Sequence, residues 1–197
     1  MLVINSRLLG TPVLSVQAGG PIANVASAVV DPNELKIIAF RLEGPLVNRG
    51  DANLLDVRSI REYSNFGMVI DNIDELIADD DVIKIANVLE LNFDLLGLKV
   101  KTKKGTKLGH ITDFSVTSED FIVQQIIVKR PIVKAIVDPE LTISRKEIVE
   151  VNDYEVIVKD EEKVLKARAE KEDFVPNFVN PFREQGFAPA KTDEKED

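Results

Sequence analysis

Two stretches of the chain are alike residue by residue. Residues 1–13 read MLVINSRLLGTPV, and residues 88–100 read VLELNFDLLGLKV. When Gly10 is placed over Gly97, an offset of 87 residues, the same residue types recur in the same order: Leu2, Asn5, Leu8, Leu9, Gly10 and Val13 return as Leu89, Asn92, Leu95, Leu96, Gly97 and Val100. Agreement in order, spacing and residue type indicates a repeated structural unit.

The likeness continues along the chain at offsets of 86 to 88 residues. Further matched segments are 22–25 with 108–111, 37–40 with 125–128, and 66–70 with 154–158. Small changes in turn length explain the drift of the offset. We therefore expect two copies of one unit, predicted as domains over residues 1–83 and 88–159, followed by a C-terminal segment over residues 160–197.

Each copy has the pattern of a β structure. In the second copy, β-branched and alternating segments flank Lys103-Lys104-Gly105-Thr106, where Gly105 can take the positive φ that a tight hairpin needs. Several short strands at close spacing are typical of an antiparallel barrel. The predicted strands lie near residues 2–4, 11–17, 22–30, 35–42, 54–57 and 68–70, and near residues 99–102, 107–116, 122–128, 133–137 and 155–158.

The predicted fold class is mainly all-β, with two tandem small antiparallel barrels. Short helical pieces are expected at 72–78, 79–87 and 146–149, and a charged C-terminal helix at 160–172 before an extended tail. A small barrel is filled by its own side chains and leaves no lumen for a ligand. The side chains expected to point inward are Val25, Ile38, Phe40, Ile60, Ile111, Ile127, Ile148 and Ile157.

Composition excludes several classes of protein. The 197 residues include no cysteine, which excludes disulfides, thiolate metal sites and a cysteine nucleophile. With 25 Lys and Arg against 34 Asp and Glu, the net charge of −9 repels nucleic acid and anionic lipid at long range. No segment approaches the ~18–20 apolar residues of a membrane span, and the first residues lack the pattern of a secretory signal. We expect a cytoplasmic protein without membrane insertion.

The repeated motif resembles the PRC-barrel family, which is seen in the cytoplasmic part of the photosynthetic reaction-centre H subunit and in the C-terminal half of the ribosome maturation factor. The pattern of that family, Leu-Leu-Gly-x-x-Val followed by Gly-x-Ile, reads here as 95–100 and 108–111. In the first copy, residues 8–13 match, but Ala23 stands where the pattern prefers glycine.

The resemblance covers residues 1–160 and implies two small β-barrels. Its motifs belong to the scaffold, so it brings no catalytic or cofactor residues to this chain. It implies a role in assembly or as an adaptor, and it leaves the partner open.

One basic cluster stands out in the acidic chain. It contains Lys99, Lys101, Lys103, Lys104 and Lys107, of which the first three share one face of a strand. These lysines are candidates for contact with phosphate, RNA or an acidic protein surface, the acidic first copy included. They are also what a solvated hairpin would carry.

The C-terminal segment holds four of the nine phenylalanines, at Phe174, Phe178, Phe182 and Phe187. Pro176 and Pro181 argue against a continuous helix there. Exposed phenylalanines are unfavourable unless they dock. Two interpretations stay open: docking on a groove of the same chain, or anchoring to another protein as a short peptide.

The remaining polar residues do not form a reactive constellation. His110 is the only histidine, and a catalytic role would need a carboxylate within hydrogen-bond reach. The run Asp79-Asp80-Asp81 lacks calcium-loop spacing and is interpreted as a solvated helix start. We therefore predict no metal, no cofactor and no enzymatic activity.

The sequence leaves two functional hypotheses. The leading one is a non-enzymatic protein-interaction or assembly module with an unidentified protein partner. The alternative is an RNA- or ribosome-associated processing or maturation factor.

Overall fold

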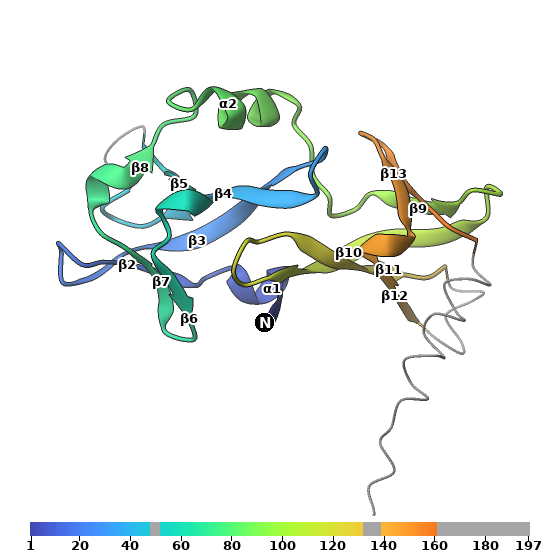
Figure 1. The fold of residues 1–197 in the computed structure, drawn as a ribbon, viewed down its shortest axis with the longest axis horizontal. Coiled ribbons are helices and arrows are strands. Elements are labelled where there is room, and N and C mark those ends of the chain that lie inside the picture. The colour runs from blue at the N-terminus through green and yellow to red at the C-terminus, as the bar shows by residue number, and fades with distance from the viewer. Residues whose placement is uncertain (48–51, 132–138, 161–197) are drawn as a thin grey trace, which may run out of the picture.

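The computed structural model describes residues 1–47, 52–131 and 139–160 and consists mainly of strands in two sheets (Figure 1). The predicted strand at 133–137, the predicted helix beyond Asp160 and the four tail phenylalanines lie outside the described residues.

The first sheet is built from the first copy. Its seven strands are ordered β6-β7-β2-β3-β4-β5-β8. Their bounds are β2 Pro12–Ser15, β3 Gly20–Asp31, β4 Lys36–Glu43, β5 Leu54–Asp56, β6 Glu62–Ser64, β7 Gly67–Ile70 and β8 Leu76–Ile77.

The second sheet repeats this arrangement. Its main path runs β12-β11-β10-β9-β14-β13, the same order of equivalent strands read in reverse, and β1 adds to β10. The bounds are β1 Leu2–Ile4, β9 Lys99–Thr102, β10 Lys107–Thr117, β11 Val123–Lys129, β12 Glu140–Ser144, β13 Ile148–Val151 and β14 Glu155–Val158.

Both sheets differ from the expected antiparallel barrels. Each contains one parallel pair, β2 with β7 in the first and β9 with β14 in the second. Among the described residues, neither ladder closes on itself, because the outermost strands of each path are not paired with one another. Over the described residues, the two sheets are mixed and open.

In the part of the chain that the structure describes, the helices are short. The helices are α1 Asn5–Leu8 and α2 Ile83–Glu90, with 3-10 turns η1 Val57–Ser59, η2 Ile73–Glu75 and η3 Arg145–Glu147. The helix expected over 72–78 is only η2 followed by β8. Asn72 and Glu75 form a capping box at the start of this turn, but Leu76 and Ile77 then pair with β5 and do not continue the helix. The acidic run precedes α2 without capping it: Asp79 pairs with Arg41 at 3.2 Å, and Asp81 accepts from the Ala78 N–H.

The N-terminal strand crosses to the other copy. The pattern of residues 2–4 predicts a strand of the first copy, but β1 pairs with β10, Leu2 opposite Thr117 and Ile4 opposite Ser115. The first residues therefore tie the first copy to the second sheet.

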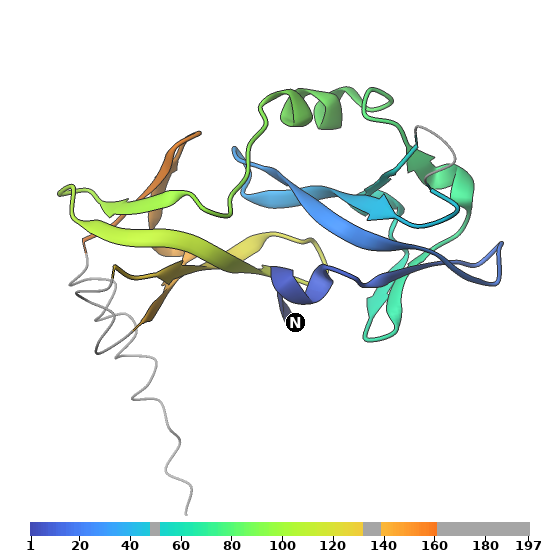
Figure 2. The same ribbon diagram turned by 180° about the vertical axis from the view of Figure 1, so that it is seen from behind.

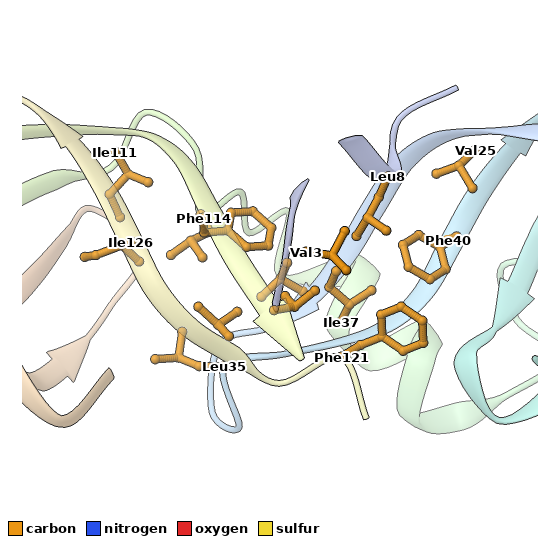
Figure 3. Packing of buried hydrophobic residues seen from close by; sticks show 14 of the residues in the cluster. Val3, Leu8, Val25, Leu35, Ile37, Phe40, Ile111, Phe114, Phe121 and Ile126 are labelled. Atoms are coloured by element: carbon orange, nitrogen blue, oxygen red, sulfur yellow. The ribbon is translucent and has the colours of Figure 1, made fainter. Parts of the chain in front are cut away.

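The two copies also contact each other through the turns of two β-hairpins, β3-β4 in the first copy and β10-β11 in the second (Figure 3). We call these two turns the hairpin tips. Leu35 precedes β4, and Phe121 occupies the equivalent place before β11, 86 residues later. The Ile37 N–H donates to the Phe121 carbonyl at 3.0 Å, and the Val123 N–H donates to the Leu35 carbonyl at 2.9 Å. This reciprocal pair of hydrogen bonds joins the two β-hairpins.

Buried side chains from both sheets form one apolar cluster. Phe121 of the second copy packs edge-on against Phe40 and Tyr63 of the first copy, with ring centroids 5.3 and 6.1 Å apart. Leu35 of the first copy lies on the side of Ile126 in the second sheet (Figure 3). Aromatic pairs in this geometry each add about 0.5–1.5 kcal/mol beyond burial.

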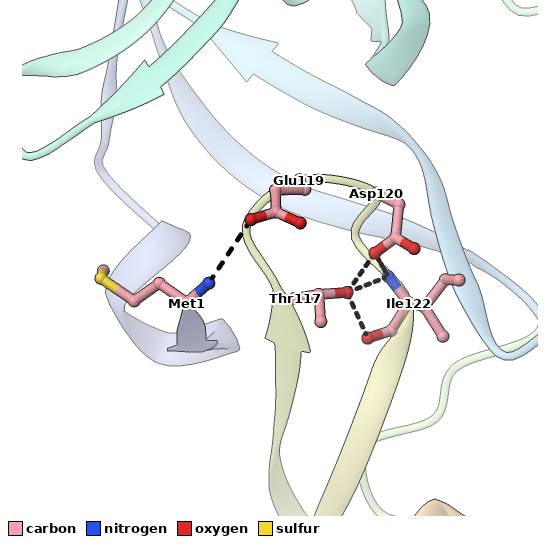
Figure 4. A network of polar contacts seen from close by, with 5 residues as sticks. All are labelled: Met1, Thr117, Glu119, Asp120 and Ile122. Carbon is pink, nitrogen blue, oxygen red and sulfur yellow. Dashed lines mark hydrogen bonds and ion pairs between the residues drawn. The ribbon is translucent and has the colours of Figure 1, made fainter.

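Polar contacts hold both tips in place. In the turn before β11, the Thr117 hydroxyl donates to Asp120 and accepts from the Ile122 N–H, and the N-terminal ammonium lies 4.0 Å from Glu119 (Figure 4). The hydrogen bond from Thr117 holds the pKa of Asp120 below its ordinary value. These contacts shape the turn that presents Phe121.

Arg145 fastens the tip of the first copy to the second sheet. Its guanidinium donates to the carbonyls of Leu35 at 2.9 Å, Val123 at 3.1 Å and Glu34 at 2.6 Å. One side chain thus satisfies backbone oxygens from both copies.

Some residues expected to point inward do not. Val25, Phe40 and Ile111 are buried in the shared cluster, and Ile60 and Ile148 pack against it. Ile127 and Ile157 are only half-buried, whereas Ile126, Val128, Val156 and Val158 are fully buried. A register shift opposite Ser115 and Val116 inserts Gln124 as an extra residue in β11, and an extra residue reverses the faces of the strand beyond it.

A second, smaller cluster lies on the other side of the first sheet. Ile38, Ala39 and Leu54 pack there with Ile85 and Val88 of α2. Figures 1 and 2 show α2 lying across this sheet. Ile38 is therefore buried, but beneath α2 and not in the shared cluster.

Candidate interaction surface

The lysine cluster occupies the hairpin that joins β9 to β10. The expected turn forms: the Gly105 N–H donates to the Thr102 carbonyl at 2.8 Å, and the Thr102 N–H donates to the Thr106 carbonyl at 2.9 Å. Gly105 has φ of +81°, a conformation that glycine adopts without strain. The hairpin lies at the end of the molecule away from β8 (Figure 1).

The predicted lysines differ in their surroundings. Lys103, Lys104 and Lys107 are exposed. The Nζ of Lys104 lies 3.4 Å from the Oδ2 of Asp160. The half-buried Lys101 forms an ion pair with Glu155 of β14. Exposed ion pairs contribute about 0–1 kcal/mol, so Lys104 remains available for a competing anion.

Strand pairing extends the basic surface across three strands. Lys101 lies opposite Lys107, Lys99 lies opposite His110, and His110 lies opposite Lys129. Directly paired residues project from the same side of a sheet. We call this set the basic face: Lys99, Lys101, Lys107, His110 and Lys129.

Sequence reasoning did not include Lys129 or His110 in this group. Lys129 follows Lys107 by 22 residues and lies on a different strand. Only the register of β10 with β11 brings it to the cluster. The sequence does place Lys129 at the end of a predicted β-branched strand. Its partner on β10 cannot be predicted from the sequence, because the bulge in β10 shifts the register of β10 with β11.

A depression of about 360 Å³ lies on this surface. It is lined by Lys99, Lys101 and Lys107, with Glu155 and the exposed ring of Tyr154. Like charges placed directly opposite one another destabilise a sheet. Among residues 1–47, 52–131 and 139–160, Glu155 is ion-paired with Lys101 and Glu140 lies opposite Lys129 on β12, which leaves the four lysines of the basic face against two carboxylates. The arrangement can therefore hold an anionic group of a partner.

The other polar candidates lie apart from one another. His110 is exposed with lysines as its cross-strand neighbours, and Asp113 instead accepts from the backbone N–H groups of Ser6 and Phe114. Within the part of the chain that is described, no three His, Asp or Glu side chains form a group that could hold a metal ion. No helix in that part is long and apolar enough to cross a membrane.

No protein-family model matches this chain, and no curated protein matches it.

Proposed function

We propose that this chain is a non-enzymatic protein-interaction or assembly module built from two PRC-barrel-like units, and that its basic face binds an acidic protein surface. The observation that carries the proposal is the five-residue basic face on three adjacent strands of a chain with net charge −9. The resemblance of the Leu-Leu-Gly motifs to PRC-barrel scaffolds supports the same class of role.

The arrangement of charge favours a protein partner of opposite sign. Complementary charge accelerates encounter and selects partners. Residues 1–90 carry 7 basic and 13 acidic side chains, whereas residues 91–160 carry 11 of each. The acidic first copy repels anions at long range, so binding requires a partner that reaches the basic face locally.

Affinity purification from native cells tests the proposal. Lys107→Glu combined with Lys129→Glu reverses two charges of the basic face. The matched control, Arg7→Glu combined with Lys146→Glu, changes the net charge equally at exposed positions outside it. We expect a protein partner that survives RNase treatment, is retained by the control and falls at least ~10-fold with the basic-face variant. Equal recovery with both variants would contradict the proposal.

A second candidate, an RNA- or ribosome-associated factor, is favoured by Tyr154. Its side chain is 80% exposed and lines the same depression as Lys99 and Lys107. Aromatic rings beside a basic groove stack on unpaired bases, contributing about 1–3 kcal/mol per base. Under this alternative, Tyr154→Ala weakens binding of a single-stranded RNA oligonucleotide at least ~5-fold, and affinity falls steeply with salt. Affinity unaffected by either change would exclude it.

A further inference from the structure

A groove of about 320 Å³ lies where the two copies meet. Leu9 and Leu96, the equivalent leucines of the two Leu-Leu-Gly motifs, both line it, together with Val88, Phe93 and Phe114. The groove contains none of the residues of the basic face, so occupation of the groove is independent of the proposed function.

One buried amide oxygen that belongs to a residue of this groove has no hydrogen-bond partner among the described residues. Asn5 is 4% exposed, and its Oδ1 accepts no hydrogen bond from the described residues. Its counterpart in the second copy, Asn92, lines the same groove but is exposed, and its Nδ2 donates to the Glu90 carbonyl at 3.2 Å. Buried side-chain amides are nearly always hydrogen-bonded, so Asn5 indicates that a polar group is to be placed beside it.

The chain itself carries a segment of fitting chemistry. After Asp160, 37 residues follow, and they include phenylalanines at 174, 178 and 182 with prolines between them. Proline favours extended backbone, and an isolated extended backbone makes no hydrogen bonds with itself. Such a segment offers apolar rings to the groove and main-chain groups to the amide of Asn5.

The segment is long enough to reach. The 18 residues from Asp160 to Phe178 span up to about 60 Å when extended. A compact chain of about 160 residues has a radius of gyration of only about 15 Å.

We propose that residues 174–182 of the same chain dock in the groove between the two Leu-Leu-Gly motifs. The phenylalanine rings lie against Phe93 and Leu96, and a main-chain group pairs with the Asn5 amide. Docking covers the apolar surface of Leu9, which is 43% exposed.

Photo-crosslinking in the full-length chain tests this. p-Benzoylphenylalanine replaces Phe178, and mass spectrometry locates the crosslinks after irradiation of dilute protein. We expect crosslinks within one chain to residues 26–30 and 88–96. The same probe at position 187, outside the docking segment, should give these crosslinks at least ~5-fold less often. Crosslinks to other regions, crosslinks only between two chains, or equal yields at both positions would overturn the proposal.

A groove variant provides the second measurement. Ser27 is exposed and lines the groove, so Ser27→Glu places a charge there without disturbing the core. We expect at least ~5-fold fewer groove crosslinks from position 178, whereas Ser27→Ala leaves the yield unchanged. Circular dichroism confirms that both variants fold. An unchanged yield in folded Ser27→Glu would overturn the proposal.

Discussion

Phe121 is held in a left-handed backbone conformation, with φ of +54°. Bulky residues seldom adopt it, and Leu35, its counterpart in the first copy, has φ of +46°. Both side chains are nonetheless buried, at 3% and 6% exposure. The packing of each side chain with the other copy outweighs the local strain. Pattern alone could not have identified these two residues, because the local sequence disfavours the conformation that they adopt.

Truncation of the Phe121 side chain should strongly destabilise the fold. We expect Phe121→Ala to lower the free energy of unfolding by about 3–5 kcal/mol, since its ring packs against Phe40 and Tyr63. The matched control is Phe66→Ala, because Phe66 is 83% exposed; its effect should stay within about 0.5 kcal/mol. Urea denaturation measures both. Equal effects of the two substitutions would show that Phe121 is not part of the core.

Asp56 should make stability depend on pH. Burial alone would raise the pKa of its carboxyl, but hydrogen bonds from the side chain and backbone of Arg58 outweigh burial and hold the pKa below the ordinary 3.8. The backbone N–H of Arg58 lies 2.9 Å from Oδ1. A lowered pKa in the folded state stabilises the fold above the unfolded pKa, and this stabilisation is lost as pH falls through the folded value.

We therefore expect Asp56→Asn to be less stable than the parent at pH 7. The difference should shrink as the pH falls below about 3.8. Urea denaturation across pH 2–7 measures it, with exposed Asp153→Asn as the control. A difference that grows towards low pH would contradict the assigned direction of the shift.

At the scale of elements, the sequence predicted the strands better than their partners. The hairpin at Lys103 to Thr106 and the β-branched strands are local features, so their patterns suffice. Local patterns did not predict the parallel pairs or the pairing of β1 with the other copy, because these pairings join residues that are distant in sequence. The extra residue Gln124 in β11 likewise changed which residues of β11 face inward.

Gly109 shows why the second copy needs glycine in β10. It has φ of +145°, and a Cβ there would collide with the carbonyl oxygen of Lys129. We expect Gly109→Ala to lower the free energy of unfolding by about 2 kcal/mol or more. Gly20→Ala is the control, since Gly20 has open space around it and no positive φ. Thermal denaturation of the two variants measures the difference. A Gly109→Ala variant as stable as the parent would mean that the backbones of β10 and β11 do not approach each other so closely at this position.

Arg145 should act as the link between elements of the two copies. Arg145→Met removes its donors to the carbonyls of Glu34, Leu35 and Val123, and we expect a loss of about 2 kcal/mol. Lys146→Met, at the exposed next position, should change stability by less than about 0.5 kcal/mol. Denaturant midpoints report both values. Similar losses of stability in the two variants would show that the three hydrogen bonds of Arg145 do not stabilise the fold.

At the scale of the whole molecule, the sequence pattern predicts the repeat but not the shared core that the two copies form. The motif starting at Leu8 and its return at Leu95 indicated two copies, and the two sheets do share one strand order. The sequence suggested two separately filled barrels. Instead, residues from both sheets form one cluster, because each copy inserts a hairpin tip into the other. The basic face was partly predicted, since neighbouring lysines are visible in sequence and cross-strand neighbours are not.

The two copies share one core, and we therefore expect them to unfold together. Native-state hydrogen exchange followed by mass spectrometry, comparing the parent chain with Phe121→Ala, tests it most directly. Phe121 belongs to the second copy, but its ring packs in the first. We expect the amides of β3 and β4 to lose as much protection as those of β10 and β11. Loss of protection confined to β10 and β11 would contradict it.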